Sequence, residues 1–103
     1  MYYSNGADIV WDEGKNEQLK AERGLSFEVF AEMILRESYI AVKKNPVRKE
    51  QMIFLCRYQG YIHVVPFVVD DQGCIVLKTV FPSRKYQKWY GGDLNERDQF
   101  RCI

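Results

Sequence analysis

The sequence lacks an apolar run near the roughly 20 residues that a membrane-spanning helix needs. It also lacks a basic segment followed by an apolar one at its start, MYYSNGAD, so nothing there marks the chain for export. We therefore expect a cytoplasmic protein that does not enter a membrane. Its three cysteines show no CxxC spacing, which indicates reduced thiols and argues against a disulfide framework or a zinc site. No metal or other cofactor is expected.

What is present is an ordinary globular composition, with 47% apolar and 28% charged residues among 103, enough for one domain with a single core. The charge is uneven along the chain. Residues 1–35 carry 3 basic and 7 acidic side chains, whereas residues 36–88 carry 10 and 4. Such asymmetry is compatible with a phosphate-binding surface, although solvated surfaces also show it.

The pattern predicts a small α+β domain over residues 9–90, with a flexible arm before it (1–8) and a polar tail after it (91–103). After a short strand at 8–12, Asp12 caps a polar surface helix over 13–23, which buries little beyond Leu19 and Ala21 and ends at Gly24. Ser26 caps a second helix, and Leu25 before it is placed to pack on Phe30. The apolar stripe from Phe27 to Leu35 predicts that this second helix covers the sheet.

Residues 43–50 predict a solvated loop, and three antiparallel strands follow it at 51–58, 61–69 and 74–81. The two-residue turn Gln59–Gly60 places Tyr58 opposite Tyr61 and Cys56 opposite His63. Alternation then separates two faces. The aliphatic face, expected beneath the second helix, holds Ile53, Leu55, Ile62, Val64, Val68, Ile75, Leu77 and Phe81. The other face holds Phe54, Cys56, Tyr58, Tyr61, His63, Val65, Phe67 and Lys78. A bulge at Gly73 is the alternative, and it would shift the last strand, with Lys78, by one residue.

Cys56 opposite His63 raises the question of a nucleophilic pair or half of a metal site. No third partner and no oxyanion loop accompany them, so we interpret the two as neighbours on a half-covered sheet face. His63 is the only imidazole in the chain for proton transfer near neutral pH.

A basic, aromatic helix is predicted after Pro82–Ser83, with a glycine pair at 91–92 to end it. Arg84 and Lys88 lie one turn apart, and Tyr86, Trp89 and Tyr90 share another face. The helix can therefore pack by its rings and offer its cations, with Lys85 and Lys78, to a phosphate. The alternative is a solvated basic face. Arg57 is expected to reach the edge of the helix-covered face.

The exposed aromatic face, Phe54, Tyr58, Tyr61 and Phe67, is unusual for a soluble monomer. It indicates base stacking, a protein partner, or cover from the N-terminal strand and the tail. We favour a protein partner.

Four features in this order resemble the BrnT-like toxins of bacterial type II toxin–antitoxin systems. They are a WDExKN start (Trp11, Asp12, Glu13, Lys15, Asn16), an RGLSFE segment (Arg23 to Glu28), a three-strand meander, and a strand-to-helix SRK (Ser83, Arg84, Lys85). The resemblance covers residues 9–90. It differs from the family pattern at Arg23, where a histidine is usual, and at Pro82–Ser83, where a small pair is usual.

The resemblance implies a RelE-like fold, with an antiparallel meander covered by N-terminal helices and a C-terminal helix. It implies a ribonuclease that acts on mRNA and arrests translation without a metal. The partner is an antitoxin, through which the pair contacts operator DNA. The family's terminal motif matches at Arg84 and Lys85.

On this basis Arg84, assisted by Lys78 or Lys85, is the candidate stabiliser of phosphorane charge. The acid and base are left to His63, Arg23 or a lysine. Lys85, Lys88 and Arg57 are the candidate RNA-binding residues. Phe54, Tyr58, Tyr61 and Phe67 are the candidate partner-binding residues. The alternative is a catalytically degenerate toxin fold that acts as a partner-binding or operon-regulating subunit.

Overall fold

The computed structural model describes residues 3–5 and 7–90 and has the α+β content that the sequence predicts. In chain order its elements are β1 (Tyr3–Asn5), β2 (Ala7–Val10), α1 (Glu13–Arg23), α2 (Phe27–Leu35), β3 (Ala41–Lys44), β4 (Met52–Tyr58), β5 (Tyr61–Val69), β6 (Ile75–Leu77), β7 (Phe81–Pro82) and α3 (Arg84–Tyr90). None of the helices in these residues is long and apolar enough to cross a bilayer. The predicted tail at 91–103 and its glycine pair lie outside the described residues.

The first two helices begin, and the first one also ends, where their capping residues predict. The Asp12 carboxylate accepts a hydrogen bond from the Lys15 backbone N–H at 3.1 Å, and the Ser26 hydroxyl accepts one from the Val29 N–H at 3.4 Å. Gly24 ends α1 in the left-handed conformation, with φ at 66°. One detail differs: Ala21 is exposed, and Asn16 is the residue buried beside Leu19.

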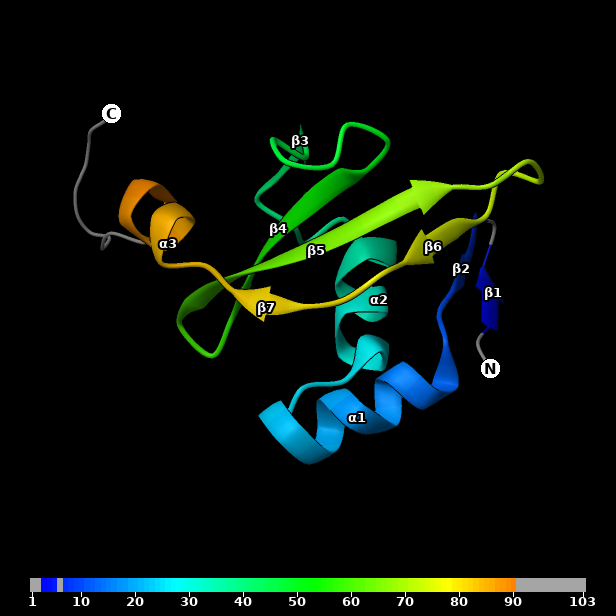
Figure 1. Ribbon diagram of the computed structural model, residues 1–103, viewed down its shortest axis with the longest axis horizontal. Coiled ribbons are helices and arrows are strands. Elements are labelled where there is room, and N and C mark those ends of the chain that lie inside the picture. The colour runs from blue at the N-terminus through cyan, green and yellow to red at the C-terminus, as the bar shows by residue number, and fades with distance from the viewer. Residues whose placement is uncertain (1–2, 6, 91–103) are drawn as a thin grey trace.

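The predicted meander of β4, β5 and β6 is confirmed, and so is the register that pairs Cys56 with His63. The turn residues Gln59 and Gly60 both have positive φ, at 53° and 79°, as the tight hairpin requires. The sheet continues on both sides of the meander, in the order β1-β2-β6-β5-β4-β3, with β7 also paired to β5. β2 runs parallel to β6 (Figure 1).

Two segments expected to lie outside the sheet therefore belong to it. Residues 3–5 pair with 7–9 as β1 and β2, where a flexible arm was expected. Lys43 and Lys44 pair with β4 as part of β3, where a loop was expected. In both cases the added strand lies beside another strand. It pairs with backbone N–H and C=O groups of that neighbour, which the sequence pattern alone had left without partners.

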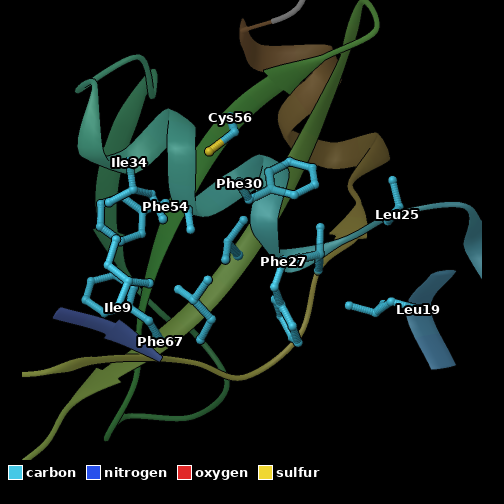
Figure 2. Close-up of a cluster of buried hydrophobic side chains, with 13 residues drawn as sticks. Ile9, Leu19, Leu25, Phe27, Phe30, Ile34, Phe54, Cys56 and Phe67 are labelled. Carbon is cyan, nitrogen blue, oxygen red and sulfur yellow. The ribbon is translucent and has the colours of Figure 1, made fainter. Parts of the chain in front are cut away.

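The prediction for which helix covers which face is wrong. α2 packs on the face that holds Phe54, and α3 packs on the aliphatic face through Tyr86 and Tyr90. The side chains that meet under α2 include Phe27, Phe30 and Ile34 from the helix and Phe54, Cys56 and Phe67 from the sheet (Figure 2). Both faces are apolar, so alternation separates them without showing which one each helix covers.

The last strand is displaced by one residue from its predicted register. The Asp70 carboxylate accepts hydrogen bonds from the N–H groups of Gln72 and Cys74, both at 2.9 Å, which makes Cys74 part of the turn. Leu77 consequently pairs with Phe67 and joins the core under α2, instead of the aliphatic face.

A β-bulge separates β6 from β7. The Lys78 N–H donates to the Pro66 carbonyl at 2.8 Å, whereas Phe81 pairs with Val64. The segment from Lys78 to Phe81 therefore contains one residue more than the segment of β5 from Pro66 to Val64. Pro66 has no N–H to pair at this place, which makes it a natural site for a bulge. The bulge buries Val80 in the core under α2.

Candidate active site

A pocket of about 580 Å³ is lined by residues at the end of α1, in the β4–β5 hairpin and in β7. Figure 1 shows these three segments near one another. Its lining residues are Arg23, Leu25, Tyr58, Gln59, Tyr61, His63, Phe81 and Pro82. The fold thus brings together two of the predicted catalytic residues, Arg23 and His63, which lie far apart in the sequence. We call this the His63 pocket.

The His63 ring is held in one orientation by its surroundings. It is 8% exposed, and its centroid lies 5.6 Å from that of Phe30 and 5.7 Å from that of Tyr58. Nδ1 lies 3.0 Å from the Tyr61 carbonyl oxygen. Because a carbonyl oxygen only accepts hydrogen bonds, Nδ1 carries the proton, and Nε2 of the neutral ring is the nitrogen that can accept one.

Arg23 is the last residue of α1, and its guanidinium is fixed by the bulge. Its Nη1 donates to the Val80 carbonyl oxygen at 2.9 Å. This bond uses one of the five N–H donors of the guanidinium. An arginine held in this way at the wall of a pocket can present its charge to an anion without having to be ordered first.

Cys56 pairs with His63 across β4 and β5, but its thiol is unsuited to nucleophilic chemistry. Its side chain is fully buried, and burial raises the pKa of the thiol to about 12. It therefore stays protonated near neutral pH, which supports the interpretation of Cys56 and His63 as sheet neighbours. Among the side chains that the structure describes, those of residues 9–90, no three from His, Cys, Asp or Glu lie close enough together to hold a metal ion.

Lys78, the third predicted catalytic residue, lies in a different cavity. The displaced register and the bulge place it in a second hollow of about 460 Å³. This hollow is lined by Lys15, Asn45, Val47, Arg48, Gln51, Pro66, Lys78, Thr79 and Phe81. We call it the basic hollow. Lys15, Arg48 and Gln51 were not predicted as site residues, because nothing in their spacing indicates that three separate segments meet here.

Arg84, the fourth candidate, is the exposed first residue of α3, two residues beyond Pro82 of the His63 pocket. Ser83 caps this helix, because its hydroxyl accepts a hydrogen bond from the Tyr86 N–H at 3.2 Å. Arg84 is not among the lining residues of either cavity.

The predicted RNA-binding residues also lie outside the two cavities. Lys85 Nζ lies 5.0 Å from the ring centroid of Trp89, and Lys88 is exposed. Arg57 donates to the Tyr90 carbonyl oxygen at 2.8 Å and so holds the end of α3. Trp89 was expected to pack inward with the other rings of α3, but it is 61% exposed.

The exposed aromatic face that was proposed for partner binding does not exist as a surface. Phe54 and Phe67 are 5% and 6% exposed, and their rings stack on each other beneath α2 with centroids 4.4 Å apart. Tyr58 and Tyr61 are half-buried and line the His63 pocket. The reversed helix cover explains this error, because α2 buries the face that was expected to stay open.

Scans of the sequence against protein-family models and against curated proteins find no match. Among solved structures, the chain is similar to the Brucella abortus ribonuclease toxin BrnT, with a TM-score of 0.57 and 20% sequence identity. The similarity covers 75% of this chain and 96% of that protein. The chain therefore has the α+β fold of the BrnT ribonuclease toxin, as the resemblance in its motifs implied.

Proposed function

We propose that this protein is the toxin of a type II toxin–antitoxin system, a metal-independent endoribonuclease that cleaves mRNA in the His63 pocket. The observation that carries the proposal is the meeting of the chain's only imidazole with an arginine in one open pocket. The fold shared with a ribonuclease toxin supports it. Inhibition of translation and neutralisation by an antitoxin are parts of the same proposal.

The reaction is an attack of a ribose 2′-oxygen on the adjacent phosphorus, which breaks the bond from phosphorus to the 5′-oxygen. The products are a 2′,3′-cyclic phosphate and a free 5′-hydroxyl. Nε2 of His63 accepts the 2′-hydroxyl proton, and the same imidazolium returns a proton to the departing 5′-oxygen. Arg23 stabilises the additional negative charge on the phosphorane oxygens. The hydroxyls of Tyr58 and Tyr61 are further donors at the pocket wall.

The test is cleavage of a fluorescently labelled single-stranded RNA by the purified protein in buffer that contains a chelator. We expect His63→Ala to slow cleavage by about 10²–10⁴-fold, the usual range for loss of a general acid–base group. Arg23→Ala should slow it by about 10²–10³-fold. Arg36→Ala is the matched control, because Arg36 is an exposed arginine that pairs with Glu32 at the end of α2, outside the pocket. Intact RNA with the wild-type protein, or cleavage by His63→Ala at the wild-type rate, would refute the assignment.

A second candidate is a non-catalytic toxin fold that binds a partner and regulates its operon. The bond from Arg23 to the Val80 carbonyl favours it, because it gives this arginine a structural role. A histidine is usual at this position in the toxin family that the motifs resemble. Co-expression with the product of an adjacent small gene distinguishes the two. A tight complex, with no growth arrest by the free protein and no RNA cleavage, selects the second candidate.

A further inference from the structure

The basic hollow gathers positive charge from three separate parts of the fold. Lys15 comes from α1, Arg48 from the segment between β3 and β4, and Lys78 from the bulge between β6 and β7. No acidic side chain of the part of the chain that the structure describes is among its lining residues. Three cations around one cavity, without a carboxylate among these described residues, favour an anionic ligand.

The wall formed by residues 45–51 is ordered by its own hydrogen bonds. The side-chain oxygen Oδ1 of Asn45 accepts hydrogen bonds from the backbone N–H groups of Val47 and Arg48, at 2.9 and 3.2 Å. The two ends of the segment are joined by the bond from the Asn45 N–H to the Gln51 carbonyl, at 3.1 Å. Arg48 therefore extends from a fixed turn, whereas the sequence predicted a solvated loop whose mobile charges add non-specific phosphate affinity.

Gln51 supplies a buried polar group at the hollow. Its side chain is 9% exposed, and its Oε1 accepts a hydrogen bond from Asn45 Nδ2 at 3.1 Å. Among residues 9–90, its Nε2 has no hydrogen-bond acceptor. A buried amide donor is normally paired, so a donor of this kind in the wall of a basic cavity fits an anionic oxygen as its acceptor.

Phe81 connects the basic hollow with the proposed site of cleavage. It lines both the basic hollow and the His63 pocket, and it is 37% exposed. A chain of nucleotides that occupies both cavities must therefore pass this ring. An exposed aromatic ring on such a path is a stacking surface for a base.

We propose that the basic hollow is a phosphate subsite for the backbone of single-stranded RNA, with Phe81 as the stacking surface between it and the His63 pocket. The choice of RNA as the ligand rests on the proposed function. Lys15, Arg48 and Lys78 contact a phosphate that flanks the cleaved one, and Gln51 Nε2 donates to a phosphate oxygen. Lys78 thus binds the substrate instead of stabilising the reacting phosphorus.

The test separates binding from cleavage by use of a fluorescent single-stranded RNA with 2′-O-methyl groups, which lacks the attacking hydroxyl. Fluorescence anisotropy gives Kd over a series of salt concentrations. We expect Arg48→Gln with Lys78→Gln to reduce the slope of log Kd against log salt by up to about 0.7, the value for one neutralised phosphate of a single strand. Phe81→Leu should weaken binding about fivefold or more while leaving the slope unchanged.

The matched control is Lys44→Gln with Lys49→Gln, which removes the same charge from exposed lysines of the same region outside the hollow. The inference is wrong if the wild-type protein does not bind this RNA, if the Arg48 and Lys78 double variant keeps the wild-type slope, or if the control double variant loses as much. If unmodified RNA is bound with the expected slopes but never cleaved, the subsite stands and the proposed ribonuclease activity fails. If the wild-type protein cleaves RNA but the Arg48 and Lys78 double variant binds it as the wild-type protein does, the ribonuclease activity stands and the proposed subsite fails.

Discussion

Asn16 shows how one buried polar residue joins the first two helices. Its side chain is fully buried, and Oδ1 accepts a hydrogen bond from the Phe27 N–H at 2.8 Å. Its Nδ2 donates to the Glu28 carboxylate at 2.9 Å. The two N-terminal motifs of the toxin resemblance, WDExKN and RGLSFE, meet at these bonds. These two motifs therefore largely specify how the first two helices join. They indicate the fold more than they indicate a catalytic site.

We expect Asn16→Ala to lower the free energy of unfolding by about 1–3 kcal/mol at neutral pH, because the Phe27 N–H is left buried without an acceptor. Urea unfolding measures the change. Gln18→Ala, at an exposed position of the same helix, should stay within about 0.5 kcal/mol of the wild-type value. An equal effect of both substitutions would show that the buried junction at Asn16 does not account for the loss of stability.

Part of the Asn16 effect should depend on pH. The hydrogen bond from Asn16 lowers the pKa of Glu28 below its ordinary value of 4.5. A carboxyl group with a lowered folded-state pKa stabilises the fold above its unfolded-state pKa, and this contribution is lost as the pH falls through the folded-state pKa. The difference between the wild-type protein and Asn16→Ala should therefore narrow as the pH falls from 7 to below 4. A constant difference would separate Glu28 from the junction.

At the scale of the element, α3 depends on anchors outside itself, because its 7 residues are too few for a stable isolated helix. The backbone C=O and N–H groups of Ile62 both bind α3. The Ile62 carbonyl accepts from the Ser83 N–H at 3.0 Å, and the Ile62 N–H donates to the Gln87 side-chain oxygen at 2.9 Å. Tyr86 completes the attachment by packing into the aliphatic core cluster.

Gln87→Ala should destabilise the protein by about 1–3 kcal/mol, because it leaves the N–H of the fully buried Ile62 without an acceptor. Amide hydrogen exchange at Ile62 should become faster. Gln87→Glu keeps an acceptor oxygen at the same place and should preserve the protection of this amide. Lys88→Ala, on the exposed side of α3, is the neutral control. Unchanged exchange in Gln87→Ala would mean that this bond does not hold the helix.

Some helices and strands could be predicted from the sequence and others could not. The difference depends on whether the residues that stabilise them lie a few positions away in the sequence or far from it. The caps of α1 and α2 and the β4–β5 hairpin depend on residues a few positions apart, and they are confirmed. β3 was missed because its two lysines hide a strand that is paired only through β4. The register of β6 depends on how the Asp70 side chain closes its turn, which hydrophobic alternation does not report.

At the scale of the whole molecule, the sheet is a middle layer with α1 and α2 on one face and α3 on the other. The sequence left this arrangement undetermined because either apolar face could receive α2, and only the path of the whole chain decides. The same limit applies to the candidate site. His63 and Arg23 could be named from the sequence, but their common pocket, and the separate hollow around Lys78, depend on tertiary placement.

The rate at which the Cys56 thiol is modified can show whether α2 stays packed on the sheet. Its thiol is enclosed between α2 and the sheet, and burial raises its pKa to about 12. We expect a thiol reagent at pH 8 to leave Cys56 unmodified in the native protein and to modify it at the rate of global unfolding in urea, as measured by peptide mass spectrometry. Cys74, which is half-buried, is the internal comparison. Rapid native-state modification of Cys56 would mean that α2 leaves the sheet without unfolding of the rest.

The parallel pairing of β2 with β6 also sets the order in which the molecule can be completed during synthesis. Ile9 pairs with Ile75, and Arg23 bonds to Val80, so early segments wait for late ones. The wall of the His63 pocket is closed by Phe81 and Pro82. An unfinished chain on the ribosome cannot yet have this pocket. For the proposed ribonuclease, the message that encodes it is thus translated at least beyond the codon for Pro82 before that copy of the enzyme can attack any RNA.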